Sequence, residues 1–256
     1  MIPLIDLHCH LLAGLDDGPR TQEDALEMCR IMTQEGIQMS VALSHQNHRW
    51  QVTPTEIREA TELLRKVLRE EGVSLAIFPS SEVMVAPDTP EQWRQGNLLS
   101  INDQSKVLLI EMPRGVFVDL EPTVVQLQKD GVRPLLAHPE QQPEFMEDTE
   151  LLESLIRAGC LVQVSAGNLT KSLTKKEEKT FKDWFRRGLV HVLGSDGHSP
   201  RKRQPRMQDA YQQVVNWVGR QIADQVFYTN GMTVLQGLPL KVPPPKPKSK
   251  LWFLPF

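Results

Sequence analysis

The chain has 256 residues, of which 40% are hydrophobic and 24% are charged, and its formal net charge is −3. This composition is typical of a soluble globular protein and argues against a disordered chain. The basic residues are spread along the chain except near the C-terminus, which argues against a general nucleic-acid binder. The three cysteines, the absence of a signal-like leader and the lack of any apolar run near the roughly 18 residues that span a bilayer predict a cytoplasmic protein without disulfides.

Short apolar segments alternate with amphipathic helical segments along the chain. Three helices carry start signals, in which a threonine is followed three residues later by an acidic residue: Thr21, Thr53 and Thr174. The expected strands cover residues 3–10, 39–45, 74–82, 106–112, 133–138, 160–166 and 190–196. The expected helices begin near residues 21, 53, 89, 121, 149 and 174, and two more, 207–218 and 221–228, close the domain.

These seven strand–helix units predict a parallel sheet covered by helices. Seven repeats favour a closed or nearly closed barrel as a single domain over residues 1–240, with an open, doubly wound sheet as the alternative. No glycine-rich phosphate-binding loop follows any strand, which weakens the nucleotide-binding form of the open sheet. Residues 241–256 form a separate tail that is basic and rich in proline and ends in an aromatic segment.

Six of the seven expected strands end in a side chain of a metal-binding type. In a parallel barrel these ends lie on one face, and that face carries the active site. His8 and His10 are two residues apart on a strand, so their side chains point to the same side. The candidate metal ligands are His8, His10, Asp17, His45, Glu82, Glu111, His138, Asp196 and His198.

This set is larger than the roughly four to six ligands that one ion takes, so it predicts more than one metal ion. Imidazole mixed with carboxylate favours Mn, Fe or Zn over Mg, Ca or Cu(I). Two of the positions also have ordinary structural interpretations. Glu111 could pair with Arg114, and Asp17 could serve only to form a turn.

Several neighbouring polar residues are expected to have other roles. Asp16 is expected to shape the turn that precedes the first helix. Ser165 and Asn168, after the sixth strand, are candidates to support the cluster through hydrogen bonds. His48 lies in a polar loop and His191 at the start of its strand, so both are expected to lie outside the cluster.

The strand-end motifs, taken together and in order, resemble one family. Asp6-Leu7-His8-Cys9-His10 followed by Gly14-Leu15-Asp16-Asp17-Gly18 is similar to its opening. Ala137-His138-Pro139-Glu140 and Ser195-Asp196-Gly197-His198 are similar to its later blocks. The family is the PHP (polymerase and histidinol phosphatase) superfamily, and within it the bacterial manganese-dependent protein-tyrosine phosphatases of the CpsB/YwqE type.

The resemblance implies a distorted (β/α)7, TIM-like barrel with three divalent metal ions, usually manganese. It implies that His8, His10, Glu82 and Asp196 hold the first ion, that Glu82, Glu111 and His138 hold the second, and that Asp17, His45 and His198 hold the third. The implied catalytic residues are Asp196, His198 and Arg203. The implied reaction is hydrolysis of phosphotyrosine on the tail of a bacterial tyrosine kinase that controls capsule or exopolysaccharide synthesis.

The sequence departs from the family pattern where the phosphate would bind. The family often has an arginine three residues after the histidine of the fifth strand, and this chain has Gln141 there. A neutral amide donates a hydrogen bond but brings no charge. Arg203 matches the family's second phosphate-binding arginine, and Arg206 of the same basic segment is a further candidate for substrate binding. We therefore expect weakened phosphate binding or an altered substrate.

Two other functions remain open from the sequence. The same metal face would suit a phosphatase of small phosphate esters such as histidinol phosphate. The neutral Gln141 would also suit a metal-stabilised binding protein with weak activity. The tail, residues 241–256, is expected either to pack on the barrel or to dock on the kinase or on an anionic membrane surface, where lysines attract and aromatic side chains insert.

Overall fold

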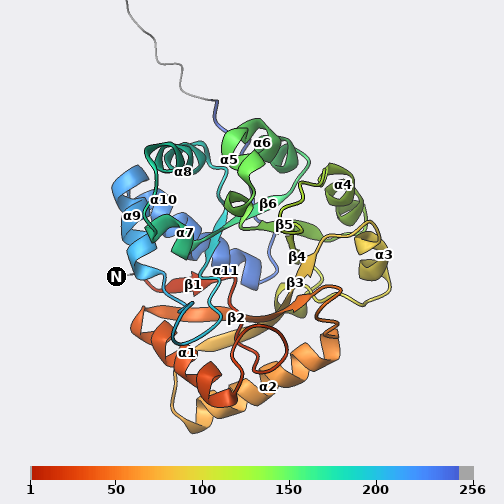
Figure 1. The fold of residues 1–256 in the computed structure, drawn as a ribbon, viewed down its shortest axis with the longest axis vertical. Coiled ribbons are helices and arrows are strands. Elements are labelled where there is room, and N and C mark those ends of the chain that lie inside the picture. Colours follow the sequence, from red (N-terminus) through yellow and green to blue (C-terminus); the bar gives the residue numbers. More distant parts are fainter. Residues whose placement is uncertain (1, 248–256) are drawn as a thin grey trace, which may run out of the picture.

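The computed structural model describes residues 2–247, which contain one sheet of seven parallel strands, each paired with the next in chain order. Helices surround these strands (Figure 1). The strands are β1 (Leu4–Asp6), β2 (Ile37–Gln46), β3 (Ala76–Met84), β4 (Val107–Glu111), β5 (Arg133–Ala137), β6 (Leu161–Ser165) and β7 (Val192–Gly194). All seven fall within or overlap the ranges expected from the sequence.

Three helices begin at the predicted capping threonines. Thr53 and Thr174 each exchange hydrogen bonds with the glutamate three residues on, and Thr21 accepts one from the backbone of Asp24. The helices are α1 (Gln22–Gln34), α2 (Pro54–Glu70), α3 (Thr89–Arg94), α4 (Glu121–Lys129), α5 (Pro143–Glu147), α6 (Thr149–Arg157), α7 (Ala166–Thr170), α8 (Lys175–Arg187), α9 (Gln208–Val218), α10 (Arg220–Asp224) and α11 (Asn230–Leu235).

The first and last strands meet, so the sheet closes into a barrel. Backbone hydrogen bonds run from Leu7 N to Leu193 O (3.2 Å) and from Asp196 N to His8 O (2.7 Å). Gly194 permits this approach, because a Cβ at that position would collide with the Cβ of His8. The barrel prediction is confirmed, and the alternative of an open, doubly wound sheet is excluded.

Two apolar layers hold the barrel together. The inner layer consists of strand side chains that point into the barrel, and Val234 and Leu235 of α11 close it at the end away from the candidate ligands. The outer layer lies between the strands and the surrounding helices and includes the fully buried Phe181, Trp184 and Phe185 of α8. Burying these large side chains removes the most apolar area from water and fixes α8 against the sheet.

The C-terminal helices differ from the expectation. The sequence predicted one helix over 221–228, whereas the chain forms α10, a π-helical turn (Gln225–Thr229) and then α11. Helix α11 contains Gly231, where a Cβ would come within 3.0 Å of the side chain of Ile5. This close packing on β1 explains why a helix carries glycine at a position that lowers its local helix propensity.

The first part of the tail lies against the barrel. Val242 packs on the core, and Lys246 exchanges hydrogen bonds with Arg187, from Lys246 N to Arg187 O (3.1 Å) and from Arg187 Nε to Lys246 O (2.7 Å). The packing expectation therefore holds for this part, whereas the aromatic end, residues 251–256, lies outside the described residues. Within residues 2–247 the structure has no helix with the length and apolar character needed to cross a membrane.

Candidate metal centre

The nine candidate ligands lie together at the end of the barrel where the strands finish. Strands β2, β3 and β4 carry His45, Glu82 and Glu111 within their last residues. The others come from the segments that follow β1, β5 and β7 and from the loop before α1: His8, His10, His138, Asp196, His198 and Asp17. Parallel strands bring all these segments to one face, as the sequence predicted.

Glu82 is the centre of the cluster and is almost fully buried. Its Oε1 lies 2.8 Å from His138 Nε2 and 3.3 Å from His8 Nε2. Its Oε2 lies 3.0 Å from His45 Nδ1 and 3.2 Å from His10 Nε2. Burial opposes ionisation of this carboxyl, but the surrounding imidazoles, His8 first among them, hold its pKa well below the usual range. Glu82 is therefore an ionised carboxylate, and it belongs to two of the groups of side chains with the geometry to hold a metal ion.

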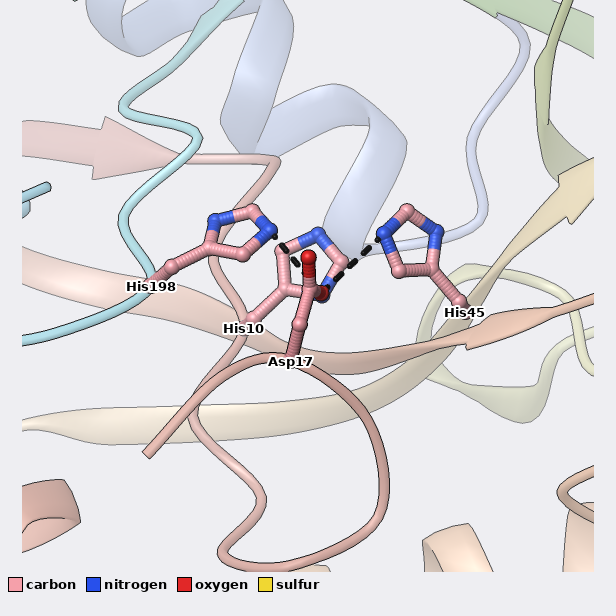
Figure 2. A group of neighbouring side chains, drawn as sticks. All are labelled: His10, Asp17, His45 and His198. Atoms are coloured by element: carbon pink, nitrogen blue, oxygen red, sulfur yellow. Dashed lines mark ion pairs between the residues drawn. The ribbon is translucent and has the colours of Figure 1, made fainter. Parts of the chain in front are cut away.

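Besides the histidines around Glu82, a second group of neighbouring side chains consists of His10, Asp17, His45 and His198, whose ligand atoms face one another (Figure 2). Asp17 Oδ1 lies 3.4 Å from both His45 Nε2 and His198 Nε2. The rings of His10 and His198 have centroids only 3.8 Å apart. The family resemblance implied the set Asp17, His45 and His198, and the structure adds His10 to it.

A third group consists of His45, Glu82 and Glu111. His45 Nδ1 lies 3.2 Å from Glu111 Oε1, whereas His138 Nε2 lies 4.0 Å from Glu111 Oε2. The resemblance implied the set Glu82, Glu111 and His138, and His138 also lies beside Glu82, at 2.8 Å. The alternative role of Glu111, a pair with Arg114, does not form among the described residues, and the carboxylate faces the imidazoles instead.

Two of the candidate ligands have a strained backbone. His138 and Asp196 have φ of 33° and 56°, a left-handed conformation that non-glycine residues rarely adopt. Such a conformation costs on the order of 1–3 kcal/mol and persists where the surrounding structure requires it. Here it turns both side chains inward: Asp196 Oδ1 lies 3.5 Å from His8 Nε2, and its Oδ2 lies 2.7 Å from Arg203 Nη2.

Two polar residues behind the cluster orient its first histidines. Gln163 Oε1 accepts a hydrogen bond from His8 Nδ1 (2.9 Å), and Asp16 Oδ2 accepts one from His10 Nδ1 (2.7 Å). With Nδ1 carrying the hydrogen, the Nε2 lone pair of each ring faces the cluster, which is the arrangement that metal-binding histidines use. Asp16 also accepts from the backbone N–H of His45 and Gly18. Asp16 therefore shapes the turn, as expected, through its bond to Gly18 N, and it also orients His10, a role that the sequence did not predict.

The donor atoms suit divalent cations. Five of them are buried and have no hydrogen-bond partner among the described residues: His8 Nε2, His10 Nε2, His45 Nδ1, Glu82 Oε2 and Glu111 Oε1. Buried polar atoms normally have hydrogen-bond partners, so imidazole nitrogens and carboxylate oxygens that face one another without hydrogen bonds are suited to hold metal ions.

The carboxylates of the cluster raise the pKa values of two of its imidazoles. Burial opposes charge on His8, but Glu82 raises the pKa of this imidazole to about 9. Burial also opposes charge on His45, but Asp17, followed by Glu111 and Glu82, raises its pKa to about 12. Without metal, His8 and His45 thus bind protons, whose positive charge balances the neighbouring carboxylates. Bound metal cations would balance the same carboxylates in place of these protons.

A cavity of about 470 Å³ opens above the cluster. Both Gln141 and Arg203 line it, as expected for substrate-binding residues. Several further lining residues were not predicted, among them Trp50, Arg49 and Arg114. The Trp50 ring stacks on the His45 ring at an interplanar angle of 13°. The Arg49 guanidinium lies 4.4 Å from the centroid of the Trp50 ring. Their position in loops directly after β2 and β4 was the signal in the sequence that could have identified them.

Three residues with predicted roles near the site lie elsewhere. Arg206 does not line the cavity, and its guanidinium is paired with Glu35 at 2.8 Å. Ser165 N and Asn168 Nδ2 both donate to Glu140 Oε1, at 2.9 and 2.8 Å, and not to the ligand cluster.

The barrel and its donor set define a class of protein, a (β/α)7 barrel with a metal centre built from histidine and carboxylate ligands at the strand ends. The chain belongs to the family described as capsular polysaccharide synthesis, CpsB/CapC, whose model matches residues 4–236.

Individual relatives agree with this family. The tyrosine-protein phosphatase YwqE of Bacillus subtilis is 32% identical over 209 residues, covering 81% of this chain and 82% of that protein. The tyrosine-protein phosphatase CpsB of Streptococcus pneumoniae is 25% identical over 238 residues, covering 91% of this chain and 98% of that protein. A crystal structure described as YwqE from Bacillus subtilis and CpsB from Streptococcus pneumoniae, unique metal-dependent tyrosine phosphatases, matches with a TM-score of 0.88 at 29% identity, covering 95% of this chain and 99% of that chain.

Proposed function

We propose that this chain is a metal-dependent protein-tyrosine phosphatase. The observation that carries the proposal is the cluster of unpaired imidazole and carboxylate donors at the base of a cavity that also holds Arg203. The phosphatases YwqE and CpsB, which share the fold over most of both chains, support it. The family's link to capsular polysaccharide synthesis supports a phosphotyrosine substrate on a bacterial tyrosine kinase, with its tail as the target.

We further propose three divalent ions, with Mn²⁺ as the first choice and Fe or Zn as the alternatives. The residues that would hold them are His8, His10, Asp17, His45, Glu82, Glu111, His138, Asp196 and His198, with Glu82 shared between ions. Bound ions of this kind supply a nucleophilic water at neutral pH and neutralise the phosphoryl oxygens.

The chain itself binds and orients the phosphate. Arg203 is half exposed and paired with Asp196, so its guanidinium lies at the boundary between the cluster and the open cavity. It can donate to phosphoryl oxygens from there, and Gln141 can add a neutral hydrogen bond. The phenol of tyrosine has a pKa of about 10, so the leaving group needs less help from an acid than an alkyl alcohol would.

His198 has the proton arrangement that this site requires. Its Nδ1 donates to the backbone carbonyl of Asp196 (3.0 Å), which leaves the Nε2 lone pair facing Asp17 and the cavity. Burial, reinforced by the nearby charge of His10, lowers the pKa of His198 below its ordinary value. The ring is therefore neutral at pH 7 and available as a ligand or as a proton acceptor.

A comparison of substrates tests the proposal. The protein, stripped with chelator and resupplied with Mn²⁺, is assayed on a phosphotyrosine peptide, on the same peptide with phosphoserine, and on histidinol phosphate. We expect the highest kcat/KM on phosphotyrosine and no release by Asp196→Ala, while Asp209→Ala, which changes an exposed aspartate of α9 that does not line the cavity, retains activity. A preference for histidinol phosphate would replace this proposal with the small-ester phosphatase.

A further inference from the structure

A second hollow adjoins the cavity above the metal centre. It is a groove of about 950 Å³, twice the volume of the cavity, and it shares Asn47, His48, Trp50 and Met84 with the cavity wall. One side is formed by residues 51–55, which lead into α2, and the other by residues 85–98 around α3. The shared residues make cavity and groove one continuous surface, with Trp50 at the junction.

The groove is held open by the protein's own contacts. Gln46 lies between the two sides, and its Nε2 donates to Val52 O (2.7 Å) on one side and to Asn97 O (3.1 Å) on the other. Asn47 Oδ1 accepts from the backbone N–H of Trp50 (3.0 Å), which fixes the aromatic ring at the junction. A preformed groove of this kind binds a ligand without first having to order its own walls.

Two side chains of the groove lining carry a formal charge at pH 7. Arg58 is paired with Asp103 at 2.8 Å, and Asp88, at the α3 side, accepts from the amide of Gln92 at 3.0 Å. The remaining lining residues are amides, hydroxyls and apolar side chains: Gln46, Asn47, Gln51, Thr53, Thr55, Thr89, Asn97, Val52, Val83, Val85 and Leu98 among them. This mixture offers hydrogen bonds to a peptide backbone and apolar contact to uncharged side chains.

We propose that this groove binds the polypeptide that flanks the phosphotyrosine on one side, in an extended conformation and with uncharged side chains in the groove. The inference rests on the proposed function and specifies its substrate as a peptide segment, since a small phosphate ester would fill only the cavity. Because the groove leaves the cavity in one direction, residues on only one side of the phosphotyrosine enter it. Which side, N-terminal or C-terminal, is an outcome of the test.

The test compares substrates extended on one side at a time. Mn²⁺-loaded protein is assayed on p-nitrophenyl phosphate, on a blocked phosphotyrosine, and on peptides with four neutral residues added before or after it. We expect one of the two extensions to raise kcat/KM about tenfold, the effect of a few added side-chain contacts, and the other to change it little. Equal kcat/KM for blocked phosphotyrosine and both extended peptides would overturn the proposal.

A groove-filling variant with a matched control tests the location. Thr55 is exposed and lines the groove but not the cavity, so the larger side chain of Thr55→Trp should block the groove. Glu59→Trp adds the same ring one turn further along α2, outside the groove lining. We expect Thr55→Trp to abolish the gain from the favoured extension while Glu59→Trp keeps it. If Thr55→Trp lowered kcat/KM on the extended peptide and on p-nitrophenyl phosphate by the same factor, the result would contradict the proposal.

A binding measurement separates this inference from the proposed function. A fluorescent peptide that carries a non-hydrolysable phosphonate analogue of phosphotyrosine is titrated with the Mn²⁺-loaded protein, and its anisotropy is followed. Binding that the favoured extension strengthens and Thr55→Trp weakens supports the groove, even if no substrate is hydrolysed and the phosphatase proposal fails. Binding that is indifferent to extension rejects the groove, even if phosphotyrosine is hydrolysed.

Discussion

Asp16 should set the affinity of the metal centre although it is not itself a candidate ligand. Its carboxylate is almost fully buried, accepts from His10 Nδ1 at 2.7 Å, and also accepts from the backbone N–H of His45 and Gly18, each at 2.8 Å. Asp16→Asn keeps the shape of the side chain but has one oxygen instead of two, so it can still accept from His10 and His45 but not also from Gly18, and it removes the charge behind His10. Losing such a carboxylate behind a metal-binding histidine typically costs about 10- to 100-fold in metal affinity.

We expect Asp16→Asn to lower the Mn²⁺ affinity by about tenfold, or 1.4 kcal/mol, near the lower limit of this range, because the side chain keeps its shape. Asp16→Ala, which loses all three hydrogen bonds, should lie near 100-fold. Isothermal titration of Mn²⁺ into the chelator-stripped protein measures this directly, with the exposed Asp209→Asn as the charge-matched control. Unchanged Mn²⁺ affinity in Asp16→Ala, with the fold intact by circular dichroism, would refute the orienting role.

Three further predictions concern the phosphate, the closure of the barrel and the pH dependence. Gln141→Arg should raise kcat/KM on a phosphotyrosine peptide about tenfold, because it adds a charged donor to the cavity wall; no gain would mean that the missing charge is immaterial. Gly194→Ala should lower the free energy of unfolding by about 1–3 kcal/mol in a denaturant titration, because its Cβ meets His8 and Gln163, and unchanged stability would contradict this close approach. In the metal-stripped protein the pKa of His8 is raised from 6.5 to about 9 by Glu82 against the effect of burial, so its stabilising contribution is complete below pH 6.5 and is lost as the pH rises through 9. Thermal denaturation should therefore show a Tm that falls over this range in wild type and less so in His8→Gln, and parallel profiles would argue against the shifted pKa.

The sequence predicted the features that depend on local patterns. The helices that begin after Thr53 and Thr174 have the predicted reciprocal caps, because a capping box involves residues only three apart. The ligand face was predictable because parallel strands bring their C-terminal ends together, whatever the detailed packing. His45, Glu82 and Glu111 follow from strand assignment alone.

The sequence could not predict the contacts that only the closed barrel creates. Gln163 and His8 are 155 positions apart and meet because β6 lies near the junction of β1 and β7. Asp16 was interpreted as a turn residue because turns and buried carboxylates use the same residue types, and only the folded loop places it behind His10. Arg206 was assigned to the substrate because its segment is basic, but Glu35 of the segment after α1 binds its guanidinium.

The most direct test of the central claim is a Mn²⁺ titration of the chelator-stripped protein in which bound metal and phosphate release from a phosphotyrosine peptide are followed together. The account predicts no release without metal and a rate that rises with occupancy up to three ions per chain. Phosphate release from the metal-free protein, or full occupancy without any release, would contradict it.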